Sequence, residues 1–467
     1  MRLSLPGNLT LLLGVGVCLP ACASRVPSRA ELRQEALTDV AARTQVGWGA
    51  SDAGAASDRL LDAPLTDDNA VRLVILRNPS VRATLAALGV SRAELVGAGL
   101  VSNPVFGADL KSFSGRPEVE VGLTQSFLDL FLRPLRVCVA AAELEAVEAE
   151  VTRDLVAMAY DVRRALNVAR ASERLAELRR DALASATAAR ELAVRLHDAG
   201  NVTDPERTVV EAGEVRARLA ALAAEAEVAE ARETVAALLG TARIPAAGIA
   251  GTLRDDVGGL DVADVERRAW ASSLDRRAAS ARVTAAERDR QLAGRRRGVT
   301  LFGLGVVGKR EAGDGAFGAG PALDVSVPLF DQGQGVAARA EAVLRTREAR
   351  LDDLELRVAS TARRLRDRLG SLAARSTLLR EAYLPLRARF VQETLQRYNA
   401  MQIGAFDALA AKQQELDAQR EYVETLRLAW DARLDLEELL AGSLPGAHDA
   451  AEALPAPTEG PASSQGH

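Results

Sequence analysis

Apolar residues recur at steps of three and four positions along the stretch from Arg136 to Leu196. They fall at Leu144, Val147, Val151, Leu155, Met158, Val162, Ala165 and Ala169. Their mean spacing is closer to the coiled-coil period than to that of an isolated helix. No proline interrupts the chain between Pro134 and Pro205, and strong helix formers dominate. The pattern predicts one very long helix that packs against a partner along its length.

Residues 199–205, with the sequence Ala-Gly-Asn-Val-Thr-Asp-Pro, predict the end of this helix. Asp204 can cap a returning helix, and Pro205 can occupy its first position. The returning helix is predicted to reach Leu239. We therefore expect a helical hairpin whose outgoing arm, with roughly sixty residues at ~1.5 Å per residue, is on the order of 90 Å long.

The same pattern occurs again in the second half of the chain. A helical stretch from Gly335 to Tyr398, interrupted only at Pro385, is followed by a break at 399–404 and a return from Phe406 to Leu440. The Leu-Leu-Gly at 238–240 is echoed by the Leu-Ala-Gly at 440–442. We interpret this as an internal duplication, with residues 61–250 as the first repeat and residues 251–442 as the second.

Two strand-like runs precede each hairpin. The first pair is Val105–Phe113 and Glu118–Phe127; the second is Val299–Gly308 and Ala322–Leu329, joined by a glycine-rich loop at Lys309–Gly320. Alternating apolar residues give each run one face suited to hydrocarbon and one suited to water. Each run has about the ten residues that a tilted transmembrane strand requires. A small soluble sheet resting on the helices fits the periodicity nearly as well.

Four strands are too few to close a barrel, and a sheet exposed to lipid cannot leave its edges unpaired. The transmembrane interpretation therefore requires several copies of the chain. The expected fold class is mainly α with β, in which duplicated helical hairpins form a tunnel and four strands per chain join a larger barrel.

The N-terminus has the features of a targeting signal. Met1-Arg2 is basic, Leu9–Cys18 is apolar, and Leu19–Cys22 resembles a bacterial lipoprotein signal. Residues 1–21 would then be removed and Cys22 would carry lipid, although an ordinary secretory leader cut nearby remains the alternative. In that case no second cysteine is left to pair with Cys138, so no intramolecular disulfide is expected. Residues 22–60 are expected to form a linker and residues 443–467 a disordered tail.

Composition excludes several functions. The net charge of -5 is spread along the chain, so no basic face favours nucleic acid. Of the three histidines, two lie in the tail, and His197 is expected to be a surface residue. No nucleotide-binding loop, zinc spacing or nucleophile elbow occurs. We predict no catalytic residue, no bound metal, no cofactor and no enzymatic activity.

Several short phrases, taken in order, resemble the TolC family of outer-membrane efflux proteins, and its lipoprotein and heavy-metal-efflux branches in particular. They lie at 78–79, 103–104, 196–200, 325–331 and 398–409, and the resemblance covers roughly Leu65 to Gly442. No single phrase is strong, but their order, spacing and duplication are specific together.

The resemblance implies a homotrimer in the outer membrane of a Gram-negative bacterium. Each subunit would supply four strands to a twelve-stranded barrel in the lipid and four helical stretches to a periplasmic tunnel. The hairpin tips would dock on a periplasmic adaptor and an inner-membrane pump. The chain would then be a passive duct for small molecules or metal ions. A periplasmic coiled-coil spacer or adaptor without a pore is the alternative.

The resemblance also assigns roles to residues at the two tips. Asp204 and Asp407 are candidates for lining or gating the tunnel entrance, and helix capping is at least as good an explanation for both. Met401 departs from the family, which has glycine at this position, so the second tip is less certain. The residues expected to contact the adaptor are Ala199, Gly200, Asn201, Met401, Gln402 and Gly404.

Overall fold

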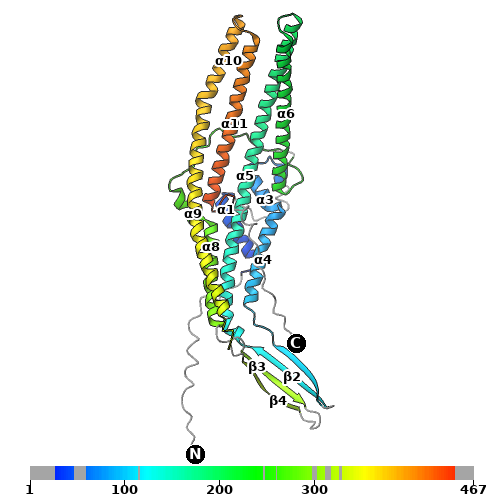
Figure 1. Ribbon diagram of the computed structural model, residues 1–467, viewed down its shortest axis with the longest axis vertical. Coiled ribbons are helices and arrows are strands. Elements are labelled where there is room, and N and C mark those ends of the chain that lie inside the picture. Colours follow the sequence, from blue (N-terminus) through cyan, green and yellow to red (C-terminus); the bar gives the residue numbers. More distant parts are fainter. Residues whose placement is uncertain are drawn as a thin grey trace, which may run out of the picture. The chain divides into compact units, whose positions relative to one another are not determined.

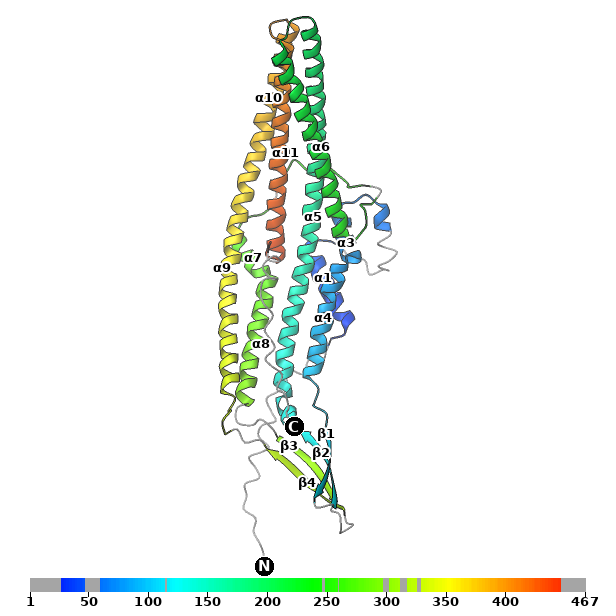
Figure 2. The same ribbon diagram turned by 45° about the vertical axis from the view of Figure 1, so that its right-hand side comes forward.

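Long helices make up most of the computed structural model, which describes residues 27–46, 59–113, 116–245, 248–258, 260–296, 302–310, 317–325 and 329–446. Figure 1 and Figure 2 show these helices and a four-stranded sheet. The helices are α1 (Arg29–Thr44), α3 (Asp67–Arg77), α4 (Pro79–Ala98), α5 (Leu128–Asp198), α6 (Asp204–Leu239), α7 (Val265–Ser272), α8 (Leu274–Arg296), α9 (Gln334–Leu378), α10 (Leu384–Asn399) and α11 (Ala405–Ala441). Cys22, the predicted signal at 1–21, residues 23–26 and 47–58 of the predicted linker, and residues 447–467 lie outside the described residues. The predicted linker also contains the helix α1, which buries Leu32, Ala36 and Val40.

The chain divides into two units, each built from segments that are far apart in the sequence. One contains Met1–Ala36, Leu85–Val151 and Arg276–Leu354, and includes the sheet. The other contains Leu37–Thr84, Thr152–Asp275 and Glu355–His467, and includes both hairpin tips. Each unit takes residues from both predicted repeats, so the repeats and the units are different divisions of the chain.

The first hairpin consists of α5 and α6, and α5 begins before the predicted start, at Leu128. Pro134 lies inside the helix, although a proline removes one backbone hydrogen bond. The first turns are held by other contacts. Leu132 and Leu135 pack with Leu292 of α8, and Arg136 donates a 3.0 Å hydrogen bond to the Leu100 carbonyl.

The second hairpin consists of α9, a π-helical turn η1 (Leu379–Tyr383), α10 and α11. The predicted interruption at Pro385 is therefore a widened turn and not a break. The Leu384 N–H donates to the Leu379 carbonyl, five residues back, and Pro385 lies in the first turn of α10, which begins at Leu384. The extra residue in the turn accommodates a proline, which lacks an N–H and clashes with the preceding turn of a regular helix.

The sheet is a simple meander in the order β1 (Val105–Phe113), β2 (Arg116–Ser126), β3 (Phe302–Arg310) and β4 (Phe317–Val325), with every pair antiparallel. β4 begins before the predicted Ala322, whereas residues 299–301 and 326–328 of the two predicted strands lie outside the described residues. The ends of the predicted glycine-rich loop are thus strand: Gly318 pairs with Lys309, and Gly320 pairs with Val307. Glycine has no side chain to show alternation, so the pattern could not reveal these pairs.

The two repeats end in the same way. Gly240 and Gly442 each take a left-handed conformation after α6 and α11, with φ of 68° and 106°. A Cβ on Gly240 would lie 3.0 Å from the Asn78 Cα, and one on Gly442 would lie 2.4 Å from the Ser272 carbonyl. Both glycines therefore allow a helix end to approach a junction between two shorter helices. This explains the echoed Leu-Leu-Gly and Leu-Ala-Gly sequences.

Cys138 is disulfide-bonded in this structure of the full-length chain. The absence of an intramolecular disulfide is predicted only for a chain that has lost residues 1–21 and carries lipid on Cys22, and for that processed chain it stays a prediction. The other two cysteines, at positions 18 and 22, lie outside the described residues.

Candidate functional site: a sheet face and two hairpin tips

One face of the sheet is mainly apolar, with Gln125 and Arg310 as polar residues in its outer rows. Residues that pair directly across an antiparallel sheet point to the same face. The register joins Phe106 to Leu123, Leu123 to Val306, and Val306 to Pro321 in one row across all four strands. The neighbouring rows on this face contribute Ala108, Leu110, Val119, Val121, Leu304, Leu323 and Val325.

These apolar side chains are exposed in the single chain. Leu110 is 80% exposed and Phe106 is 69% exposed. The other exposed members are Val119, Leu123, Leu304, Val306, Leu323 and Val325. Among the large apolar strand residues whose exposure the structure describes, Val105 is the one exposed residue on the other face. A continuous exposed apolar face of this kind marks contact with another protein or with a membrane.

The opposite face is polar and rich in glycine. Asp109, Glu120 and Lys309 form one row across three strands, and Asp324 lies on the same face. A Cβ on Gly305 would lie 2.7 Å from the Leu123 carbonyl, so β2 and β3 approach too closely for a larger residue. The two faces therefore suit hydrocarbon and water, as the alternation of the sequence predicts.

The two edges of the sheet are β1 and β4, and neither has a partner strand among the described residues. An edge strand presents a row of unpaired N–H and C=O groups. The sheet thus combines an exposed apolar face with two edges that are available for pairing.

The first hairpin turns at Ala199, Gly200 and Asn201. The Gly200 N–H donates to the His197 carbonyl, and the Asn201 N–H donates to the Leu196 carbonyl, both at 2.8 Å. Gly200 has a φ of 77°, and this set of bonds is a Schellman turn. A Cβ on Gly200 would meet nothing within 4 Å, so glycine is favoured there by conformation alone and not by space.

The second hairpin turns through the same set of bonds, with methionine in place of glycine. The Met401 N–H donates to the Tyr398 carbonyl at 2.8 Å, and the Gln402 N–H donates to the Arg397 carbonyl at 2.9 Å. Met401 has a φ of 58° and is 95% exposed. The departure at Met401 therefore leaves the backbone of the second turn like that of the first, at the cost of a strained residue.

The two aspartates at the tips make different contacts. The N-cap of α6 is Thr203 and not Asp204, because the Glu206 carboxylate accepts hydrogen bonds from the N–H and the hydroxyl of Thr203. These bonds lower the pKa of Glu206. The Asp204 carboxylate lies 2.9 Å from His197 Nε2 instead. Pro205 is accordingly the second helical residue and not the first.

Asp407 lies in the first turn of α11, and its carboxylate accepts a 3.1 Å hydrogen bond from the N–H of Gly404, the N-cap residue. This contact is a capping contact. The Asp407 side chain is also exposed, so capping leaves it free to face a solvent-filled space.

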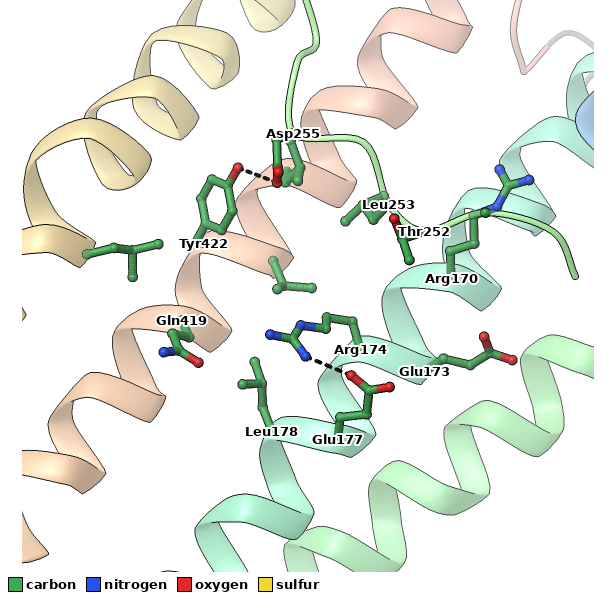
Figure 3. Close-up of a pocket in the computed structure, with 14 residues that line it drawn as sticks. Arg170, Glu173, Arg174, Glu177, Leu178, Thr252, Leu253, Asp255, Gln419 and Tyr422 are labelled. Carbon is green, nitrogen blue, oxygen red and sulfur yellow. Dashed lines mark hydrogen bonds and ion pairs between the residues drawn. The ribbon is translucent and has the colours of Figure 1, made fainter. Parts of the chain in front are cut away.

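A cavity of about 520 Å³ lies between α5, α11 and the linker at 251–255. Figure 3 shows the Tyr422 hydroxyl pointing to Asp255 and the Arg174 guanidinium pointing to Glu177. These hydrogen bonds measure 2.9 Å and 2.7 Å. The linker is fixed further by Trp430 Nε1, which donates to the Arg254 carbonyl at 2.8 Å. Tyr422 and Trp430 of α11 thus hold residues 254–255, and Arg170 of α5, which also lines the cavity, donates a 3.1 Å hydrogen bond to the carbonyl of Ala250 just before them.

No single helix in the described ranges is long and apolar enough to cross a membrane. Taken together, the two helices of the bent pair α3–α4 reach the length and apolar composition of such a span. Nor do the described residues bring three or more His, Cys, Asp or Glu side chains together in a way that could hold a metal ion.

Comparison with solved structures identifies the fold. No family model matches the sequence, and no curated protein matches it. The outer membrane protein VceC of Vibrio cholerae superposes with a TM-score of 0.66 at 18% identity, over 81% of this chain and 96% of that one. CusC, whose crystal structures concern folding and transmembrane channel formation, superposes with a TM-score of 0.66 at 13% identity. The match covers 86% of this chain and 96% of that one. The MtrE outer membrane channel of Neisseria gonorrhoeae superposes with a TM-score of 0.63 at 17% identity, over 83% of this chain and 89% of that one.

The chain therefore has the fold of these outer membrane channel proteins. The expected fold class, mainly α with a four-stranded antiparallel sheet and duplicated long hairpins, is confirmed, and so is the fold implied by the resemblance to the TolC family. At identities below one fifth, the likeness establishes the fold and leaves the function to be argued from the residues.

Proposed function

We propose that this chain is one subunit of an oligomeric outer-membrane channel. The observation that carries the proposal is the sheet, which has an exposed apolar face and, among the described residues, two edges without a partner strand. In lipid, every backbone polar group must be paired, so a sheet that meets hydrocarbon has to close. Similarity of the fold to outer membrane channels agrees with this location.

Closure requires other copies of the same chain. The β1 edge of one copy would pair with the β4 edge of the next, which is a head-to-tail contact that forms a ring. Two copies would give eight strands, and a barrel of about eight strands is filled by its own side chains. Three copies give twelve strands and are the smallest ring that leaves a channel. We therefore propose a homotrimer.

The helices have matching lateral surfaces. Within one unit, α5 packs on α11 through Leu178 and Leu416, while α6 and α10 occupy the two sides of this pair (Figure 1). Both outer helices carry exposed apolar residues that the single chain does not cover. They are Val209, Val215, Leu219 and Leu222 on α6, and Leu386, Phe390 and Leu395 on α10. In a ring, α6 of one copy would cover α10 of the next and close a helical tunnel.

The hairpin tips are proposed as the docking sites for a periplasmic adaptor and an inner-membrane pump. Ala199, Gly200, Asn201, Met401, Gln402 and Gly404 form the two turns and are the proposed contacts. Asp204 and Asp407 would form rings of carboxylates at the tunnel entrance, which attract cations. Both are exposed beside the turns, as this role requires. The pump would supply the energy, and the duct would be passive.

Lipid attached to Cys22 is proposed to anchor the N-terminus in the outer membrane of a Gram-negative bacterium. The domain division is likewise proposed as two repeats, 61–250 and 251–442, between a linker at 22–60 and a tail at 443–467.

Conductance separates the channel from the alternative, a coiled-coil spacer without a pore. Full-length protein would be extracted in mild detergent from outer membranes and added to a planar lipid bilayer, beside an extract from cells lacking the protein. A channel gives stepwise ion conductance that the control extract does not give. Protein recovered only in the soluble fraction, with no conductance, would favour the spacer.

A further inference from the structure

Glu438, near the end of α11, is buried more completely than any other charged side chain that the structure describes. It is 1% exposed. Its position in the first repeat is occupied by Ala236, because the Ser443 N–H bonds to the Glu438 carbonyl just as the Thr241 N–H bonds to that of Ala236. Ala236 is equally buried. The fold thus accepts alanine here, and the carboxylate is an addition specific to the second repeat.

Two donors contact the Glu438 carboxylate. Ser443 Oγ donates to Glu438 Oε1 at 2.8 Å, and Arg164 Nη1 of α5 donates to Glu438 Oε2 at 2.6 Å. Arg164 also pairs with Asp161 of α5 and, at 3.1 Å, with Asp435 of α11. One guanidinium is therefore shared among three carboxylates, which leaves an excess of negative charge when all three are ionised.

The surrounding elements supply no second cation at ion-pair distance from Glu438 among the described residues. The charges of Arg364 and Arg368 of α9 act to lower the pKa of Asp435 and are not paired with Glu438. Arg43 of α1 donates to the Ala441 carbonyl, and Asp275 of α8 accepts from the Leu444 N–H. Burial raises the pKa of Tyr160 on α5 to about 12, so its hydroxyl stays neutral.

We infer that Glu438 is a proton-binding group that tightens the junction of α5 and α11 on acidification. When neutral, Glu438 places no charge in the buried junction, and the Arg164 guanidinium then compensates only the carboxylates of Asp161 and Asp435. When ionised, it adds a buried charge that Arg164 compensates only in part, which weakens the junction. This inference does not depend on the proposed channel function.

The direction of the pH effect follows from the pKa. Burial raises the pKa of Glu438 from 4.5 to about 7, Asp161 acts in the same direction, and Arg164 and Ser443 act against it. Between these values the folded chain holds a proton that the unfolded chain releases. The contribution to stability is thus fully present below about pH 4.5 and is lost as the pH rises through about 7. Burial also raises the pKa of Asp431 and Asp435, which adds to the same trend.

Infrared spectroscopy on the full-length protein in detergent tests the inference directly. Difference spectra between about pH 5 and about pH 8 should contain the carbonyl band of a protonated, buried carboxylic acid. We expect this band to be weaker in Glu438→Gln by the contribution of one carboxylic acid, because Asp431 and Asp435, whose pKa values are also raised, keep theirs. Glu437→Gln is the matched control, because Glu437 is adjacent, less buried and paired with Arg433 at 2.8 Å. It should keep the band. A band of unchanged intensity in Glu438→Gln would overturn the inference.

Thermal unfolding provides a second readout. The midpoint of the wild type and of Glu437→Gln should fall as the pH rises from about 5 to about 8, and the fall should be smaller in Glu438→Gln. If the glutamine variant does not fold, Glu438→Ala takes its place in this measurement, because alanine occupies the equivalent position, Ala236, in the first repeat. Equal pH dependence in the wild type and the Glu438 variants would contradict a proton-linked junction.

Discussion

At the scale of single residues, the two hairpin turns show how one backbone arrangement is reached from different sequences. The Schellman bonds at Gly200 and Met401 involve only backbone groups, so the side chain does not decide the turn. It decides the strain, because a left-handed conformation costs a non-glycine residue roughly 1–2 kcal/mol. The sequence marks Met401 as a departure but cannot show that the turn survives it.

We predict that Met401→Gly stabilises the second tip by about 1 kcal/mol and that Gly200→Met destabilises the first by a similar amount. Open space around Gly200 means that the methionine there adds strain without a clash. Hydrogen exchange of the turn amides is the suitable measurement because tips open locally. Exchange should slow about fivefold in Met401→Gly and accelerate about fivefold in Gly200→Met. Unchanged rates in both variants would show that neither turn is strained as described.

Residue-scale contacts were also the least predictable part of the site. Asp204 looks like the cap of α6, yet Thr203 takes that position and Asp204 contacts His197. Glu437 and Glu438 are adjacent and identical in type, yet only Glu438 is buried. Which of two neighbours faces the core depends on how α5 approaches α11, and a single sequence does not contain that information.

At the scale of elements, helices and strands differed in how far the pattern determined them. The hairpins were predictable because long runs of helix formers end at glycine- and proline-containing breaks. The strand ends at 309–310 and 317–320 were missed, because Gly318 and Gly320 hide the alternation and Lys309 and Arg310 are two consecutive charged residues. The apolar face itself was predictable, since alternation survives in Val119, Val121 and Leu123.

Val306 and Val307 offer a matched test of the sheet, since these neighbours on the central strand β3 point to opposite faces. If the apolar face meets lipid, Val306→Lys should cost about 2–4 kcal/mol near the middle of the bilayer. Val307→Lys should cost much less, because its face is polar. The measurement is the amount of folded protein in the outer membrane and its urea midpoint in lipid. Equal losses in both variants would mean that the apolar face does not contact lipid.

At the scale of the whole molecule, the account depends on a ring of identical chains. The single chain leaves three surfaces without a partner among its described residues: the apolar sheet face, the sheet edges β1 and β4, and the outer stripes of α6 and α10. A head-to-tail ring in lipid satisfies all three at once. Neither composition nor periodicity specifies the number of copies, which follows from the strand count and the width that a channel needs.

The most direct test is the native mass of the full-length protein extracted in mild detergent from outer-membrane fractions, with the mass of bound detergent subtracted. The account predicts a stable complex with the mass of three chains, each 49.4 kDa before any processing. A monomer in the soluble fraction would contradict it, because a single chain cannot close four strands around a channel.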